Sequence, residues 1–155
     1  MPQLHRIFCA TPWELERERM RFHDLVGAFN ESAALPKGVL FVPVSLGNIR
    51  DKRPLQYAIE ENIQDCRYYI QLLQEDWGPV ERNFRNDYHL ALQSMDDPAL
   101  PMSGTALLAK VQPSGAPLAP GLPQPDASFS TPAEFDALMN EILARWLSTL
   151  APQAA

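Results

Sequence analysis

The stretch His5-Arg6-Ile7-Phe8-Cys9-Ala10-Thr11-Pro12-Trp13-Glu14-Leu15-Glu16-Arg17-Glu18-Arg19 decides the fold. Its apolar run Ile7–Ala10 is too short for a helix and predicts a buried strand. Thr11 is a typical helix N-cap, Pro12 suits the first helical position, and Glu14 completes a capping box with Thr11. A strand that runs directly into a helix is the first half of a βαβ unit, whose ligands lie at the carboxyl ends of the strands. Thr11 and its neighbours are therefore expected to form a fold nucleus, the rim of a ligand site, or both.

The alternation of strands and helices continues along the chain. Further strands are expected at Val39–Val44, Arg67–Leu73 and Thr105–Val111, and helices at about Pro12–Phe29, from Pro54 onward, at about Glu81–Met95 and from Thr131 to about Leu150. Pro43 cannot donate a ladder hydrogen bond, so the second strand belongs at a sheet edge. Strands that alternate with helices predict a parallel sheet covered on both faces. We therefore predict a flavodoxin-like three-layer α/β/α sandwich with four or five parallel strands in the order 2-1-3-4-5.

Composition divides the chain into an α/β domain at residues 1–111, a proline-rich linker or surface wrap at 112–130, and a C-terminal helix at 131–150. Four prolines and two glycines disfavour regular structure between residues 112 and 124. The last helix begins with a capping box from Thr131 to Glu134 and carries a wide apolar stripe. We expect this stripe to pack on the same domain. Swapping or dimerisation through the linker is the alternative.

The overall composition restricts the classes of function. The net charge of −6 argues against a general surface for nucleic acid or anionic membranes. The two cysteines, Cys9 and Cys66, favour a reducing compartment, and no apolar run reaches the roughly 20 residues that span a bilayer. The first residues lack the apolar core of a signal peptide. These features predict a cytoplasmic location.

Common cofactor and metal motifs are missing from the sequence. It has no GxGxxG, no GxxxxGK[ST] and no CxxC, and the three histidines, His5, His23 and His89, are scattered. We therefore expect no metal site and no required cofactor.

Acidic residues after the third strand are the candidate catalytic groups. Glu81 lies four residues after Trp77, and Asp87 follows on the same expected helix. A carboxylate near the carboxyl end of a strand can stabilise an oxocarbenium-like centre or act as a nucleophile. The alternative is that both acids are solvated helix charges, with Glu81 favoured by the positive end of the helix macrodipole.

The polar loop Ser45–Arg53 is the second candidate region, because it follows the carboxyl end of the edge strand. Its basic residues could contact a phosphate or an acidic partner surface. The alternative is a solvated connection. The residues expected to bind a ligand at the crevice are Thr11, Trp13, Ser45, Asn48, Arg50 and Trp77.

The opening stretch resembles the bacterial TIR-like domain of unknown function, whose first strand is followed by Ser-Ser-Thr-x-x-Asp-Leu-x-x-Glu-Arg. The residues that match this pattern are Thr11, Leu15, Glu18 and Arg19, and Glu14 replaces the aspartate. The pair Trp77 and Glu81 keeps the Trp-x-x-x-Glu spacing of TIR domains. Asp87-Tyr88-His89-Leu90-Ala91 resembles their acid-x-x-x-Ala helix pattern. The resemblance extends from about Arg6 to Val111.

This resemblance implies a TIR-like signalling or protein-interaction module of a bacterial effector or defence-type system, with nucleotide sensing at its crevice. Self-association or a partner protein is expected for such a module. TIR domains and nucleoside deoxyribosyltransferases share this fold, and their active members use a glutamate at the start of such a helix to act on the N-glycosidic bond of NAD or a nucleoside. The alternative function is thus an N-glycosidic hydrolase or transferase, with Glu81 and Asp87 as the candidate catalysts and NAD or a nucleotide as substrate.

Overall fold

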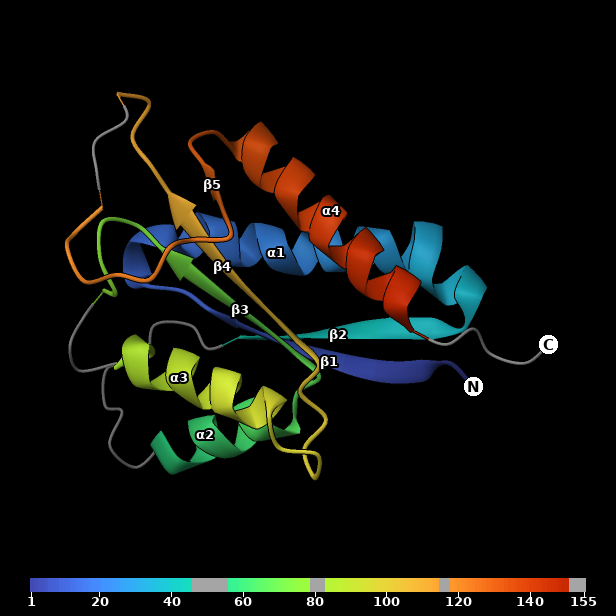
Figure 1. Cartoon of the computed structure of the whole chain (residues 1–155). Coiled ribbons are helices and arrows are strands. Elements are labelled where there is room, and N and C mark those ends of the chain that lie inside the picture. Colours follow the sequence, from blue (N-terminus) through green and yellow to red (C-terminus); the bar gives the residue numbers. More distant parts are fainter. Residues whose placement is uncertain (46–55, 79–82, 115–117, 151–155) are drawn as a thin grey trace.

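The core of the fold is a parallel β-sheet (Figure 1). The computed structural model describes residues 1–45, 56–78, 83–114 and 118–150. Within them the strands are β1 (Gln3–Ala10), β2 (Val39–Ser45), β3 (Tyr68–Leu73), β4 (Gly104–Lys110) and β5 (Ala127–Phe129). They form a five-stranded sheet in the order β2-β1-β3-β4-β5, and every neighbouring pair is parallel. The predicted sheet order and the edge position of β2 are confirmed.

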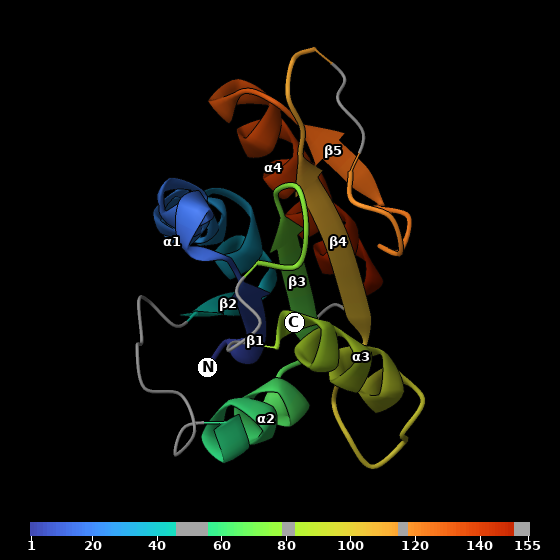
Figure 2. The same cartoon turned by 90° about the vertical axis from the view of Figure 1, so that its left-hand side faces the viewer.

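Helices cover both faces of the sheet, as predicted for a flavodoxin-like sandwich (Figures 1 and 2). They are α1 (Glu16–Phe29), α2 (Gln56–Asp65), α3 (Phe84–Met95) and α4 (Pro132–Thr149). Helices α1 and α4 lie on one face, and α2 and α3 lie on the other. Two short turns follow α1, a π-helical turn at Asn30–Ala34 and a 3-10 turn at Leu35–Lys37, before the chain enters β2.

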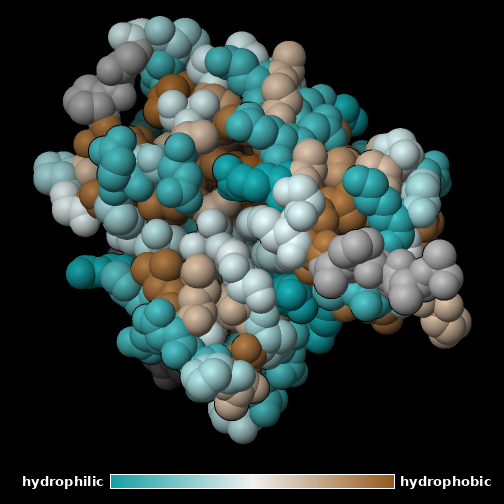
Figure 3. All heavy atoms as spheres, turned by 45° about the vertical axis from the view of Figure 1, so that its right-hand side comes forward, coloured by the Kyte–Doolittle hydropathy of each residue, from teal (hydrophilic) through white to brown (hydrophobic). Residues whose placement is uncertain are grey.

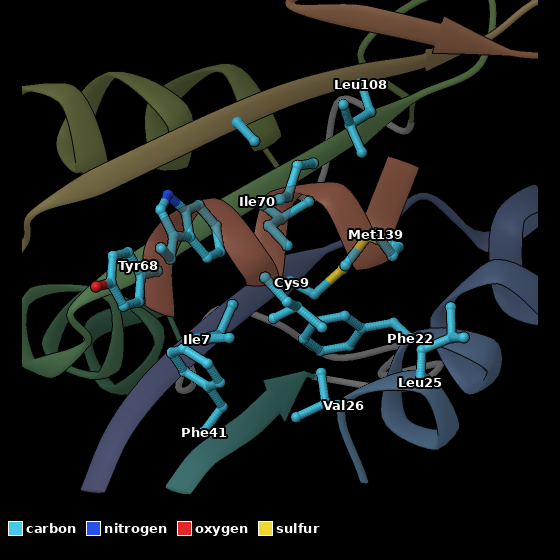
Figure 4. Close-up of a cluster of buried hydrophobic side chains, with 14 of the residues drawn as sticks. Ile7, Cys9, Phe22, Leu25, Val26, Phe41, Tyr68, Ile70, Leu108 and Met139 are labelled. Carbon is cyan, nitrogen blue, oxygen red and sulfur yellow. The ribbon is translucent and has the colours of Figure 1, made fainter. Parts of the chain in front are cut away.

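The larger hydrophobic core fills the space between the sheet, α1 and α4. Figure 4 shows Phe22 of α1 and Met139 of α4 pointing at Cys9 and Ile70 of the central strands. Tyr68 stacks on Trp146 with ring centroids 4.3 Å apart and planes 13° apart. The apolar stripe of α4 is therefore buried against the sheet rather than exposed to water.

The second core lies between the sheet, α2 and α3. Side chains alternate across a strand, so Tyr69 points to the face opposite Tyr68 and stacks on Phe8, with ring centroids 5.8 Å apart. Ile59 and Ile63 of α2 complete the cluster. Helices cover both faces of the sheet at β3, and all residues of this strand are therefore buried.

The start of α4 confirms the predicted capping box. Thr131 is the N-cap, and its hydroxyl oxygen accepts a hydrogen bond from the backbone N–H of Glu134 at 3.2 Å. The Glu134 carboxylate accepts from the backbone N–H of Thr131 at 3.1 Å. Two backbone donors at the helix start are thereby satisfied.

The described residues of the proline-rich segment lie on the surface of the domain. Its described residues before Ala127 form neither helix nor strand. Leu118 and Leu122 pack against a small cluster formed by Leu73, Leu107 and Ala109. The backbone N–H of Ala119 donates to the carbonyl of Glu75 at 3.0 Å, so this segment covers the carboxyl end of β3.

The surface mixes residue types. Hydrophilic and hydrophobic residues are interspersed on the face shown in Figure 3. Scattered exposed side chains such as Leu4 and Met20 are ordinary for a globular protein. None of the described helices is both long enough and apolar enough to cross a membrane.

Candidate functional site

The carboxyl ends of β1 and β3 form the topological switch point of the sheet. From β1 the chain crosses to the edge strand β2, and the next strand, β3, lies on the other side of β1. The connections that leave β1 and β3 therefore diverge, and a crevice opens between them. Ligands of open parallel sheets lie at such a point.

The end of β1 differs from the prediction. Thr11 is buried and caps no helix, so the predicted capping box with Glu14 is wrong. Pro12 is extended, Trp13–Leu15 form a 3-10 turn, and α1 begins only at Glu16. The physical reason is tertiary: Leu15 is completely buried and Pro12 packs against the loop after β3, which fixes the chain before a regular helix can begin.

The loop after β3 approaches β1 through Gly78. A Cβ atom added to Gly78 would lie 2.9 Å from Cβ of Pro12, and its φ of +89° is one that other residues rarely adopt. The carboxylate of Asp76 accepts a hydrogen bond from the Gly78 N–H at 2.8 Å. This glycine turn aligns the loop with the end of β1.

A hollow with a volume of about 140 Å³ lies between these two ends. The residues that line it are Pro12, Glu14, Gln74, Glu75, Asp76 and Gly78. A second hollow of about 330 Å³ shares Glu75 and Asp76 and adds Lys110, whose ammonium group lies 2.8 Å from a carboxylate oxygen of Glu18. The crevice thus combines carboxylates with one flanking cation, a set suited to hydroxyl groups and positive charge.

A buried polar network joins the two strands that border the crevice. Gln71 of β3 is completely buried, and its side-chain oxygen accepts a hydrogen bond from the hydroxyl of Tyr69 at 2.6 Å. Its amide group donates to the carbonyl of Ala10 at 3.4 Å, which joins the ends of β1 and β3. The apolar pattern of β3 gave no reason to single out this glutamine.

Asp87, one of the two predicted catalytic acids, does not line the hollows formed by the described residues. Asp87 is completely buried on α3, so the alternative of a solvated helix charge is wrong for this residue. Its carboxylate accepts a hydrogen bond from the side-chain amide of Gln56 on α2 at 3.2 Å. Trp77 is half-buried and lies against Tyr88 of α3, with ring centroids 5.6 Å apart. Glu81 lies outside the described residues.

Of the other residues expected to bind a ligand, Trp13 is 43% exposed beside the crevice. Asn48 and Arg50 lie outside the described residues. Ser45, the last residue of β2, is held by two side chains of α1: its Oγ lies 2.6 Å from Nε2 of His23 and 3.0 Å from Nη1 of Arg19. The sequence did not reveal this triad, because His23 and Arg19 precede Ser45 by 22 and 26 positions.

Burial shifts the pKa values of titratable groups near the ends of β1 and β2. Desolvation and the positive charge of Arg19 lower the pKa of His23, although Asp24 opposes this shift. Burial raises the pKa of the Cys9 thiol, which is therefore protonated and unreactive at neutral pH. Among the described residues, no group of three or more histidine, cysteine or acidic side chains is arranged to hold a metal ion.

Comparison with known proteins adds no assignment. No protein-family model matches the chain, and no curated protein matches it.

Proposed function

We propose that this protein is a TIR-like module that senses NAD by binding its nicotinamide riboside half in the crevice between β1 and β3. The observation that carries the proposal is the hollow at the switch point, lined by Glu14, Glu75 and Asp76. The sequence resemblance to TIR-like domains supports the same ligand class.

Charge and hydrogen-bonding chemistry favour this ligand over a simple nucleotide. Carboxylates accept hydrogen bonds from ribose hydroxyls, as acidic residues do in dinucleotide-binding folds. The oxidised nicotinamide ring is positively charged and is attracted to the three carboxylates, whereas a bare phosphate would be repelled. Lys110 lies in the adjoining hollow and is paired with Glu18, so it would contact the pyrophosphate by exchanging that partner.

A binding comparison between NAD and NADH tests the proposal. The two ligands have nearly the same shape, but the reduced ring is neutral, so NAD should bind more tightly. Calorimetric titration should give a dissociation constant for NAD several-fold below that for NADH. At a concentration of 100 times its dissociation constant, NAD should stabilise the fold by about 2.7 kcal/mol. Equal affinity for the two ligands, or no heat with either, would contradict the proposal.

Variants of the crevice carboxylates test the role of their charges, and an exposed acid of α4 provides the matched control. Glu75→Gln with Asp76→Asn removes two charges, and the amide that replaces the Asp76 carboxylate keeps an oxygen that can accept from the Gly78 N–H. This double variant should lose most of the preference for NAD over NADH. Glu141→Gln changes an exposed acid of α4 and should leave both affinities unchanged.

Cleavage of the N-glycosidic bond is the alternative function. The same three carboxylates favour it, because a carboxylate in contact with the ribose can stabilise an oxocarbenium-like centre. Glu75 is better positioned for this role than Asp87, whose side chain is buried between α2 and α3. Released nicotinamide, measured by chromatography, would establish the enzyme. If Glu75→Gln stops the release of nicotinamide and Asp87→Asn does not, Glu75 is the catalytic carboxylate.

Signalling through self-association is the further expectation for a TIR-like module. The β2 edge is poorly suited to strand pairing, because Pro43 lacks an N–H and the backbone groups of Phe41 are already bonded to Asn30. Assembly would therefore use helix faces. Light scattering of the full chain with and without NAD tests for self-association. A monomer under both conditions would contradict this expectation.

A further inference from the structure

A serine, a histidine and an arginine meet at the carboxyl end of β2, apart from the residues that line the crevice. Ser45 Oγ is 2.6 Å from Nε2 of His23 and 3.0 Å from Nη1 of Arg19. All three side chains are partly exposed. The guanidinium of Arg19 is held in place by Glu16, whose carboxylate accepts from its Nε at 2.9 Å.

Chemistry fixes the direction of one of the two hydrogen bonds at Ser45, and the tautomer of His23 sets the other. Arginine can only donate, so Arg19 donates to a lone pair of Ser45 Oγ. Burial and the charge of Arg19 lower the pKa of His23, and the imidazole is therefore neutral at pH 7. In the neutral tautomer that carries its proton on Nδ1, the imidazole leaves Nε2 unprotonated, and the Ser45 hydroxyl donates to it. Of the nearby ionisable groups on packed elements, Asp24 favours the charged imidazole, and Cys9 of β1 stays neutral.

We propose that Ser45 is a nucleophile, activated by His23, that transfers acyl groups from carboxylic esters to water. A serine hydroxyl within hydrogen-bond reach of a neutral imidazole is the arrangement that activates serine nucleophiles. The charge of Arg19 stabilises the alkoxide that develops on Oγ.

The reaction has two balanced steps. Ser45 Oγ attacks the carbonyl carbon of the ester as its proton moves to Nε2 of His23; the bond to the leaving alkoxide breaks, and the alkoxide takes the proton from His23. Water then attacks the acyl-serine, gives one proton to His23, and releases the carboxylic acid as Oγ recovers that proton. No oxidant, metal or cofactor takes part.

The first experiment uses the unmodified protein. The full chain is incubated with a fluorophosphonate, intact mass is measured, and the adduct is located by peptide mapping. One adduct on Ser45 supports the proposal, and it depends on no variant that could fail to fold. Absence of an adduct, or an adduct on other residues only, would overturn it.

Variants then test the role of the histidine. With p-nitrophenyl acetate, Ser45→Ala should fall to the rate of the buffer, and His23→Gln, which can still hydrogen-bond to Ser45 but cannot take its proton, should fall by about a hundredfold or more. The matched controls are Ser148→Ala and His89→Gln, which alter residues outside the cluster. Because the pKa of His23 is lowered, the wild-type rate should decline on acidification only at a pH below that at which an ordinary imidazole titrates. His23→Gln at the wild-type rate would overturn the proposal.

Discussion

The side-chain amide of Asn30 pairs with both backbone polar groups of Phe41: its nitrogen donates to the Phe41 carbonyl at 2.8 Å, and its oxygen accepts from the Phe41 N–H at 2.9 Å. Asn30 follows α1 and Phe41 lies on the edge strand, so one side chain occupies groups that would otherwise accept another strand. Asn30 thus joins the end of α1 to β2 and blocks the centre of the sheet edge.

Asn30→Ala should destabilise the fold by about 1–3 kcal/mol, because it leaves the N–H and carbonyl of Phe41 without their partner in a buried position. Denaturant unfolding followed by circular dichroism measures the loss. Asn140→Ala, at an exposed position of α4, is the control and should change stability by less than about 0.5 kcal/mol. Equal stability of the two variants would show that water replaces Asn30 at no cost.

Two glycines should respond in opposite directions to alanine. A Cβ on Gly104 would lie 2.8 Å from Nε1 of Trp146 and 3.1 Å from Cδ1 of Tyr68, so Gly104→Ala should separate the stacked rings and cost about 1–3 kcal/mol. Gly27 lies in α1 with nothing within 4 Å of its added Cβ, so Gly27→Ala should stabilise by about 0.5–1 kcal/mol. Thermal unfolding of both variants checks the signs, and a stable Gly104→Ala would mean that Trp146 can move.

Two copies of one sequence motif explain what local patterns can and cannot predict. Thr131-Pro132-Ala133-Glu134 forms the predicted capping box, whereas Thr11-Pro12-Trp13-Glu14 does not. The motif at Thr131 is exposed and follows a strand of only three residues, so local hydrogen bonds decide its conformation. The motif at Thr11 lies at the end of a buried strand, where the contact of Pro12 with the Gly78 turn overrides the local preference.

The sheet was predictable because its signals are local and repeated. Apolar runs located four strands, and Pro43 alone indicated which of them is the edge. The fifth strand, Ala127–Phe129, was not located, since three residues after a proline-rich segment carry no periodicity.

The site was predictable only in part. Ser45 was selected from its place after β2, but His23 and Arg19 belong to an earlier helix and no spacing links them to it. No sequence spacing links the crevice acids Glu75 and Asp76 to Glu14, because their grouping depends on the turn at Gly78.

Asp87 is expected to be a stability determinant of the α2–α3 interface. Asp87→Ala removes the buried acceptor of the Gln56 amide and should cost about 1–3 kcal/mol. Asn86→Ala is the matched control, because the adjacent Asn86 is exposed and its side-chain amide lies 3.4 Å from a carboxylate oxygen of Glu60. Urea unfolding compares the two. A change below about 0.5 kcal/mol for Asp87→Ala would show that the carboxylate is not retained for the fold.

The two cysteines should make the fold sensitive to high pH. Burial raises the pKa of Cys66 from 9.0 to about 11 and raises that of Cys9 as well. A raised pKa in the folded state means that the thiol contributes full stability below pH 9 and loses it as the pH rises toward 11. Each thiol should then reduce the free energy of unfolding by up to about 1.4 kcal/mol per pH unit.

Comparison with a cysteine-free variant isolates this contribution from tyrosines and lysines that titrate in the same range. Wild type and the double variant Cys9→Ala, Cys66→Ala are unfolded in urea at pH 8, 9, 10 and 10.5. The wild type should lose stability more steeply above pH 9, because only its unfolded chain releases thiol protons in that range. If the free energy of unfolding depends on pH in the same way for both proteins, the native thiols ionise as readily as unfolded ones. In that case a thiol reagent should also label the native protein rapidly at pH 8.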